Sequence, residues 1–328
     1  MTRIGLVLGA GGVVGQAFHA GVLAAIRDVT GWDPRQADFV VGTSAGSVAA
    51  ASLRAGVCAE DLFARASGRP LTPAGLLLLN GVPAPPQSQP ALEPRTQRVG
   101  PSSPELLGRL FARPGALRPG IAVSALLPEG RRDTTSWFAG FTHLFPEGRW
   151  PERPMWLCAV NLDEGRRVVF GTPGAPPATV SQAVQASCAI PAVFRPVQIG
   201  GARYVDGGVH SPTNADLLVA EGLDAVVVSS PMSADMRHDD LLSLARLRSA
   251  TRLPAKVMLS REIRKLGEAG IPVLVFEPSA SVIGEMGLQP MDFRRRAPVA
   301  EATIEAAKQH LDGPEGREVG RILMKGRS

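Results

Sequence analysis

The sequence predicts an α/β protein in which helices cover the faces of a parallel sheet. Two short apolar runs, residues 4–8 and 38–41, are typical of buried parallel strands. Each run is followed by a glycine-rich turn and then by an apolar helical segment, at 16–28 and 47–53. A strand–helix–strand–helix order places the helices on the two faces of a parallel sheet.

The length and composition fit one large folded domain. Of the 328 residues, 45% are hydrophobic and 20% are charged, which excludes wholesale disorder. The three cysteines are far apart and lack CxxC spacing, so we expect no disulfide framework, no metal cluster and a reducing compartment. We predict a single domain over residues 1–328, with a proline-rich insertion at 68–120 and a helical C-terminal tail at 278–328.

Charge and hydropathy narrow the class of partner and the location. The formal net charge is +5, but aromatic residues do not alternate with the arginines and no nucleic-acid-binding motif occurs, so we expect no nucleic acid partner. No charge lies between Arg3 and Arg27, yet glycines, Gln16 and His19 interrupt this stretch, unlike a signal peptide or a membrane span. We therefore expect a cytoplasmic protein, with membrane contact limited to the inner surface.

Further segments extend the predicted sheet. Residues 155–162 and 166–170, joined by the turn Asp163-Glu164-Gly165, predict an antiparallel pair of strands. Strands are also expected at 202–205, 223–229 and 271–276, and helices at 180–188, 239–268 (with Pro254 as its breaking point) and 298–311.

The proline-rich insertion at 68–120 interrupts this regular pattern. Its prolines leave room only for short helices, such as 105–112. Such a segment is either a flexible surface insertion or a lid, because long excursions in compact enzymes often cover the substrate cleft.

The segment Gly42-Thr43-Ser44-Ala45-Gly46 has the GxSxG pattern of a nucleophile turn. A sharp turn between strand and helix would lift Ser44 above the sheet at the N-terminus of a helix, where the helix dipole favours developing negative charge. Glycines are needed at both ends because side chains there would clash with the neighbouring strand and helix. Ser44 is therefore the candidate nucleophile.

The glycine-rich loop at 9–15, GAGGVVG, follows the first predicted strand. Dinucleotide binding fits it poorly, because neither frame gives GxGxxG and no acidic residue ends the second strand. We interpret the loop as an oxyanion hole, in which the N–H groups of Gly11, Gly12 and Val13 point at an alkoxide formed beside Ser44. Tight backbone packing is the alternative interpretation.

Ser44 needs a base, and the five histidines offer few candidates. His19 lies on a buried predicted helix, where a core histidine with satisfied hydrogen bonds is expected. His210 is the one best placed after a strand, and His238 lies in polar helical surroundings.

Asp206 is the other candidate base, because it ends a predicted strand and is followed by Gly207 and Gly208. An ordinary Asp-Gly hairpin turn would have the same local sequence. The presence of the GxSxG turn and the glycine-rich loop in the same chain favours a catalytic carboxylate.

Together these motifs resemble the patatin-like phospholipases, which are serine acyl hydrolases with a Ser–Asp dyad. The resemblance rests on the loop at 9–15, GTSAG at 42–46, ASCAIPAVF at 186–194 and DGG at 206–208. Asn161–Gly165 followed by RRVVF also matches in type, and the resemblance covers residues 3–55 and 154–230. Met286-Gly287 with Pro290-Met291-Asp292 is similar to a bacterial branch of the family.

The resemblance implies a three-layer α/β/α sandwich with a mostly parallel central sheet, Ser44 as nucleophile and Asp206 as base. The oxyanion hole would be formed by the loop around Gly11 and Gly12, and no cofactor is implied. The motif glycines are Gly9, Gly15, Gly42, Gly46, Gly207 and Gly208. The family usually carries Arg or Lys where this chain has Val14, which weakens the expectation of a phospholipid headgroup more than that of acyl hydrolysis.

We therefore expect an enzyme of lipid degradation that cleaves lipid esters, as a phospholipase A, lysophospholipase or esterase, through an acyl-enzyme intermediate. Val14 suggests one alternative, a catalytically weak regulatory or lipid-binding protein that retains the fold. A second alternative is a Ser-His-Asp hydrolase in which His210 or His238 is the base.

Overall fold

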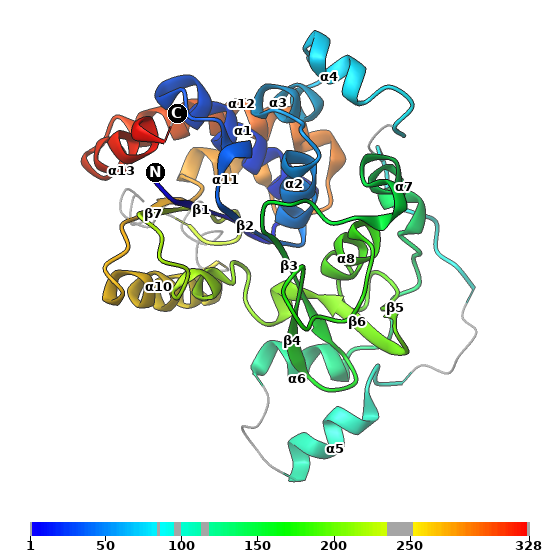
Figure 1. Ribbon diagram of the computed structural model, residues 1–328. Coiled ribbons are helices and arrows are strands. Elements are labelled where there is room, and N and C mark those ends of the chain that lie inside the picture. Colours follow the sequence, from blue (N-terminus) through cyan, green and yellow to red (C-terminus); the bar gives the residue numbers. More distant parts are fainter. Residues whose placement is uncertain (1, 84–85, 95–99, 113–117, 235–251, 327–328) are drawn as a thin grey trace.

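The computed structural model describes residues 2–83, 86–94, 100–112, 118–234 and 252–326. Its strands are β1 (Ile4–Leu8), β2 (Phe39–Thr43), β3 (Met155–Asn161), β4 (Arg166–Phe170), β5 (Val197–Ile199), β6 (Ala202–Asp206), β7 (Ala225–Ser229) and β8 (Val273–Phe276). They form one sheet in the order β5-β6-β3-β2-β1-β7-β8, with β4 paired to β3 (Figure 1). Pairing is parallel from β3 through β2, β1 and β7 to β8, and antiparallel at β4, β5 and β6.

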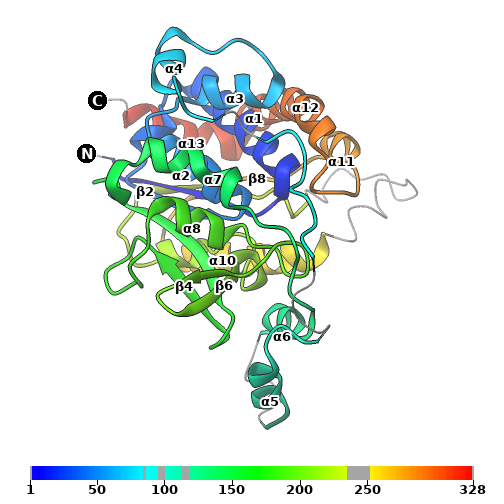
Figure 2. The same cartoon turned by 90° about the vertical axis from the view of Figure 1, so that its right-hand side faces the viewer.

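Helices lie on both faces of the sheet, as predicted (Figures 1 and 2). They are α1 (Gly12–Thr30), α2 (Ala45–Arg54), α3 (Ala59–Ser67), α4 (Pro73–Leu78), α5 (Pro104–Ala112), α6 (Pro119–Leu126), α7 (Thr135–Leu144), α8 (Val180–Ser187), α10 (Leu253–Glu268), α11 (Ala280–Met286), α12 (Arg296–Leu311) and α13 (Pro314–Lys325). The largest core cluster joins one face of the sheet to α1, α2, α8 and α12, and a second cluster joins the other face to α10. The fold is thus a three-layer α/β/α arrangement around a mixed, mostly parallel sheet.

The register along β3 brings two distant parts of the chain together. Cys158 pairs with Thr43, the last residue of β2, and the next residue of β3, Ala159, pairs with Asp206, the last residue of β6. The strands β2 and β6 therefore end side by side against consecutive residues of β3. Whatever follows Thr43 must lie close to Asp206.

Several element boundaries differ from the sequence-based expectation. The first helix begins at Gly12 rather than residue 16, because the second half of the glycine-rich loop forms its first turn. Strand β5 and helices α3 and α7 were not predicted, since each is short or lies in a stretch without clear periodicity, whereas α11 and α13 lie within the helical tail expected at 278–328. The predicted helix at 239–268 is described only from Leu253 onward, with Pro254 in its first turn, and residues 239–251 lie outside the described part.

The proline-rich insertion at 68–120 contains only short helices where it is described. Helices α4 and α5 stand away from the sheet at opposite ends of the molecule, whereas α6, at the end of the insertion, packs near η3 (Gly207–Val209) (Figures 1 and 2). Among the described residues, no helix has both the length and the apolarity needed to cross a bilayer.

Candidate active site

Ser44 occupies a strained turn between β2 and α2. Its backbone has φ 52° and ψ −116°, a region that costs a non-glycine residue about 1–3 kcal/mol. Two hydrogen bonds hold this conformation: the Ser44 amide donates to Ser187 Oγ at 2.9 Å, and the Ser47 amide donates to the Ser44 carbonyl at 2.8 Å. This is the geometry of a nucleophile elbow, and Ser44 lines a cavity there.

The two glycines of GTSAG are required by close backbone contacts. A Cβ atom on Gly46 would lie 1.9 Å from the carbonyl oxygen of Leu8, and one on Gly42 would lie 2.7 Å from the Cα of Ser47. As expected, a side chain at either position would clash with the neighbouring strand or helix.

Asp206 lies beside Ser44 at the end of β6, and both side chains are buried. The Ser44 side chain lies close enough to the Asp206 carboxylate to lower its pKa, and the Gly208 amide donates to Asp206 Oδ1 at 2.7 Å. Burial raises the pKa of Asp206 to about 6, although the Ser44 side chain and the Gly208 amide both act to lower it. A Cβ on Gly207 would lie 2.2 Å from the carbonyl oxygen of Cys158, so only glycine lets the chain turn here.

The glycine-rich loop packs against both turns. The Gly9 amide donates to the Ser229 carbonyl at 2.9 Å, the Ala10 amide donates to the Pro212 carbonyl at 2.8 Å, and the Gly46 amide donates to the Gly9 carbonyl at 3.1 Å. Helix α1 begins at the end of this loop, so its first N–H groups have no acceptor one turn earlier in the helix.

The three predicted oxyanion-hole residues do not all line the same cavity. Gly11 and Gly12 line the same cavity as Ser44, and Gly12 has φ 63°, which favours glycine. The side chain of Val13 lines a second cavity. Its backbone amide nevertheless belongs to the first turn of α1, together with that of Gly12.

His19 is a buried structural residue, as expected. Its Nε2–H donates to the Gly9 carbonyl at 2.7 Å, which leaves Nδ1 to accept from the Ser229 hydroxyl at 2.8 Å. Burial lowers the pKa of His19 to about 4, so the ring is neutral and fixes the glycine-rich loop to β7.

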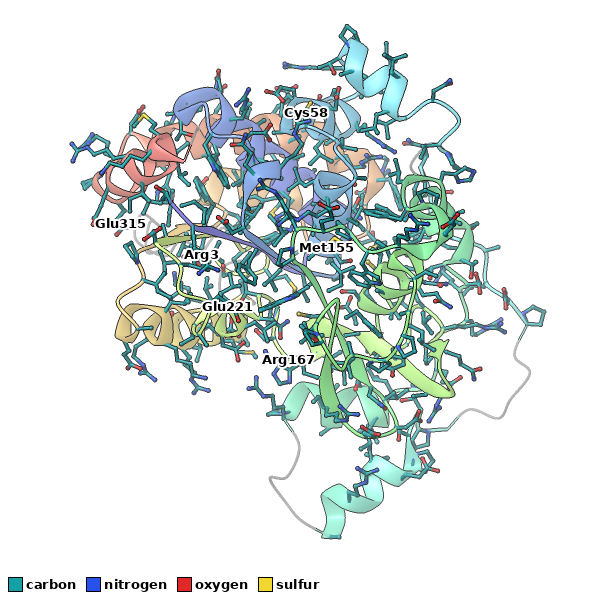
Figure 3. All side chains as sticks on the ribbon, viewed as in Figure 1. Arg3, Cys58, Met155, Arg167, Glu221 and Glu315 are labelled. Atoms are coloured by element: carbon teal, nitrogen blue, oxygen red, sulfur yellow. The ribbon has the colours of Figure 1, made fainter. Side chains whose placement is uncertain are left out.

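Of the two alternative histidine bases, His210 does not line the cavity that Ser44 lines. His210 follows η3, and burial lowers its pKa to about 4, with the nearby charges of Arg167 (labelled in Figure 3) and Arg118 acting in the same direction. Its Nδ1 is buried without a hydrogen-bond partner among the described residues. His238 lies outside the described residues.

Two supporting residues were missed by sequence reasoning. Ser187 Oγ accepts from the Ser44 amide and donates to the Cys158 carbonyl at 2.6 Å, so it ties the elbow to β3. Asn214, with φ 55°, donates from Nδ2 to Thr43 Oγ1 at 3.1 Å. The first lies in the ASCAIPAVF segment, whose resemblance signalled its importance without giving it a role, and no sequence pattern pointed to the second.

A cavity of about 530 Å³ opens above Ser44 and Asp206, and its walls are mainly apolar. The loop at 9–15, helix α6 and the C-terminal tail all contribute to it, and the Val14 amide donates to the Pro290 carbonyl of the tail at 3.2 Å. Within the described ranges, no three His, Cys, Asp or Glu side chains form a group that could hold a metal ion.

Arg252 is the cationic side chain lining this cavity, and sequence reasoning did not single it out. It donates to the carbonyls of Pro231 and Ser233 and to Met286 Sδ, all of them neutral groups. Burial lowers the pKa of Arg252 to about 10, so it stays protonated at neutral pH. No carboxylate in the described part of the chain forms an ion pair with it.

A serine on a strand–turn–helix elbow, with a buried carboxylate and the first residues of a helix lining the same cavity, is an arrangement typical of α/β serine hydrolases. The model of the patatin-like phospholipase family matches residues 6–219, more than half of the chain. The chain therefore belongs to the patatin-like phospholipase family, a family of lipid acyl hydrolases.

Among solved structures, the crystal structure of VipD from Legionella pneumophila is similar, with 15% sequence identity and a TM-score of 0.42. The match covers 95% of this chain and 66% of that chain, so this chain spans about two thirds of the length of VipD. No curated protein matches the sequence.

Proposed function

We propose that this protein is a serine acyl hydrolase that cleaves lipid esters through a Ser44–Asp206 dyad. The observation that carries the proposal is that Ser44 lines the same cavity as a buried carboxylate whose pKa is raised to about 6, on a strand that ends beside its own. A carboxylate with a pKa nearer to neutrality is a stronger base than an exposed one, and it is still mostly ionised at pH 7.

In the proposed reaction, Asp206 accepts the hydroxyl proton as Ser44 Oγ attacks the ester carbonyl carbon. The oxyanion of the tetrahedral intermediate is held by N–H groups at the start of α1, each contributing about 3–4 kcal/mol. The intermediate collapses to an acyl-enzyme and expels the alcohol, which takes the proton from Asp206. Water, deprotonated by Asp206, then attacks the acyl carbon, and the released proton returns to Ser44.

The mainly apolar cavity supports an acyl chain as the main part of the substrate. Val14 supplies no cation from the loop, but the Arg252 guanidinium lines the same cavity. With only neutral partners among the described residues, it is available to an anionic group of the substrate, such as a phosphate. We therefore include anionic lipids in the proposed substrate class.

The mouth of the cavity supports contact with a lipid surface. Val123 of α6, Met232 and Leu288 line the cavity and are 56%, 41% and 75% exposed. Exposed apolar side chains around an opening are typical of surfaces that meet lipid or protein partners. Helix α6 begins at the last residues of the insertion at 68–120, and Gly120 and Val123 both line the cavity. We therefore propose that the end of the insertion and α6, within a single domain, serve as a cover at the membrane side.

The direct test replaces each member of the dyad. Ser44→Ala and Asp206→Asn should keep the native circular dichroism spectrum and lose hydrolysis of p-nitrophenyl butyrate by roughly a thousandfold or more. His210→Ala and His238→Ala are matched controls and should keep the activity. Activity retained in either dyad variant would rule out the dyad mechanism. Loss of activity in a folded histidine variant would favour a histidine base.

A fluorophosphonate probe separates the enzyme from a catalytically weak binding protein. We expect it to label Ser44 of the wild-type chain, because the reaction needs an activated hydroxyl. A folded protein that stays unlabelled, while still binding lipid, would support the binding protein instead.

A further inference from the structure

A second apolar cavity, of about 120 Å³, lies on the other side of the first turn of α1. The side chain of Val13 lines it, whereas Gly12 and Val14 line the candidate active site. Aromatic side chains of α7, including Trp137 and Phe141, form much of its wall. The wall also includes parts of α2 and α3 and residues near the start of α12.

Two arginines also line this apolar cavity. Arg65 comes from α3 and Arg296 is the first residue of α12, and Arg296 Nη2 donates to the Arg65 carbonyl at 2.9 Å. The Nε of Arg296 is buried and has no hydrogen-bond partner among the described residues. A buried unsatisfied donor of this kind requires an explanation, and an unseen anion or water is a common one.

The two guanidinium groups are not neutralised by the described part of the chain. Burial lowers the pKa of both, and the charge of Arg65 lowers that of Arg296 further. Asp61 acts in the opposite direction on Arg65, but its carboxylate already accepts from the amide and hydroxyl of Thr72 at 2.7 and 2.9 Å. No ion pair within 4.0 Å joins Arg65 or Arg296 to a described carboxylate.

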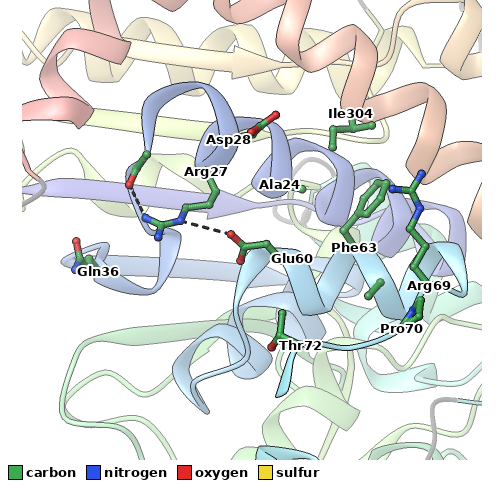
Figure 4. Close-up of a pocket in the computed structure, with 12 residues that line it drawn as sticks. Ala24, Arg27, Asp28, Gln36, Glu60, Phe63, Arg69, Pro70, Thr72 and Ile304 are labelled. Carbon is green, nitrogen blue, oxygen red and sulfur yellow. Dashed lines mark hydrogen bonds and ion pairs between the residues drawn. The ribbon is translucent and has the colours of Figure 1, made fainter. Parts of the chain in front are cut away.

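Two neighbouring arginines, in contrast, form ion pairs with carboxylates. In the surface groove beside α1 and α3, Arg27 pairs with Glu60 at 3.5 Å (Figure 4), and Arg69, which also lines the groove, pairs with Glu301 at 2.7 Å. Both of these arginines are paired with carboxylates, so they do not indicate an anion site in that groove. The cavity of Arg65 and Arg296 differs, because it combines an apolar wall with two arginines that form no ion pair with a carboxylate in the described ranges.

We propose that this second cavity binds an anionic amphiphile, a carboxylate or phosphate on an alkyl chain. The head group would lie on the Arg65 and Arg296 guanidiniums, including the free Arg296 Nε, and the first carbons of the chain would lie against Trp137 and Phe141. A cavity of about 150 Å³ holds benzene, so about 120 Å³ takes only the carbons nearest the head group. The site extends beyond the proposed hydrolysis, because it uses neither Ser44 nor Asp206.

Calorimetric titration of the Ser44→Ala protein tests the proposal without interference from turnover. Hexanoate, hexyl phosphate and hexanol serve as probes, and we expect an anionic probe to bind at least tenfold more tightly than hexanol. Preference for hexanoate would identify a fatty-acid site, and preference for hexyl phosphate a lipid-phosphate site. Arg65→Gln and Arg296→Gln should each weaken anion binding at least tenfold, whereas the control Arg69→Gln should not.

Fluorescence quenching locates the bound probe. It does not need the Arg296→Gln variant, so it tests the site even if that variant fails to fold. The bromine of 2-bromohexanoate, on the carbon next to the carboxylate, should quench Trp137, and the quenching should disappear in the Trp137→Phe variant and weaken in Arg65→Gln. Equal binding of hexanol and the anions, or an equal effect of Arg69→Gln, would overturn the site. Binding that survives in folded Arg65→Gln with unchanged affinity would overturn it as well.

Discussion

The backbone amide of Ser44 donates a hydrogen bond to Ser187 Oγ at 2.9 Å, although 143 positions separate the two residues in the chain. The same hydroxyl donates to the Cys158 carbonyl, so one side chain links the elbow, α8 and β3. The strained conformation of Ser44 is thus held from outside its own turn.

Replacing Ser187 with alanine should therefore affect both stability and rate. The buried Ser44 amide would lose its acceptor, which costs about 1–3 kcal/mol in the free energy of unfolding. A shifted elbow should also lower kcat on p-nitrophenyl butyrate, by roughly 10- to 100-fold. Ser181→Ala is the control, since Ser181 lies on the same helix and bonds the Phe138 carbonyl instead. An unchanged kcat in folded Ser187→Ala would contradict this role.

The pH dependence of the reaction should report the buried carboxylate. The pKa of Asp206 is raised to about 6, and the ionised form is the base, so kcat/KM should fall as pH drops through about 6 and level off above about 7. A profile measured on a neutral ester checks this. A profile still flat at pH 4.5 would argue against Asp206 as the base.

The same shift makes a prediction about stability. Because the folded pKa lies above the unfolded value, the folded state binds the proton more tightly, and stability is lost as pH rises from about 4 through about 6. The loss is about 2–3 kcal/mol for this group. Asp206→Asn cannot ionise, so its stability relative to wild type should increase over this range in urea titrations. A difference that does not change with pH would show that the shift is absent.

Glycines in this fold should differ sharply in their tolerance of a methyl group. Gly46→Ala places a Cβ against the Leu8 carbonyl, so the elbow must move and we expect a protein that is unfolded or inactive. Gly267, on α10, has open space around it, and Gly267→Ala should raise stability by about 0.5–1 kcal/mol. Thermal unfolding of both variants is the measurement, and an equally stable Gly46→Ala protein would be inconsistent with the close contact.

Arg252→Gln should alter substrate preference. The variant loses the cation in the candidate active-site cavity, so the ratio of kcat/KM for an anionic lysophospholipid to that for a neutral monoacylglycerol should fall roughly tenfold, the effect of one charge-assisted hydrogen bond. Kinetics on the two substrates below their micellar concentrations provide the ratio. If the ratio stays constant, Arg252 does not meet the anionic group.

The exposed apolar mouth should matter only at a lipid surface. Leu288→Asp should lower hydrolysis of vesicle-bound substrate while changing the rate on a monomeric short-chain ester much less, because a charge at the mouth opposes contact with the bilayer. Leu77, on α4, is 80% exposed but does not line the cavity, so Leu77→Asp is the matched control. An equal loss of vesicle hydrolysis in the two variants would show that the mouth of the cavity is not the surface that contacts the bilayer.

Local sequence was sufficient for much of the fold and of the candidate site. Continuous apolar runs predicted β1, β2, β7 and β8, because strands buried on both faces need apolar side chains at every position. GTSAG predicted the turn at Ser44, since only glycine fits where its backbone meets β1. These features depend on neighbours in the chain or on steric rules that hold in any fold.

Tertiary structure decided which distant groups meet. The pairing of Thr43 and Asp206 with consecutive residues of β3 puts the hydroxyl and the carboxylate side by side, and no local pattern encodes that register. The contribution of Arg252 to the cavity and the raised pKa of Asp206 depend on burial by segments far away in the chain. Burial and electrostatic environment are properties of the packed molecule. The sequence therefore identified the candidate dyad, whereas the pKa of its carboxylate depends on the fold.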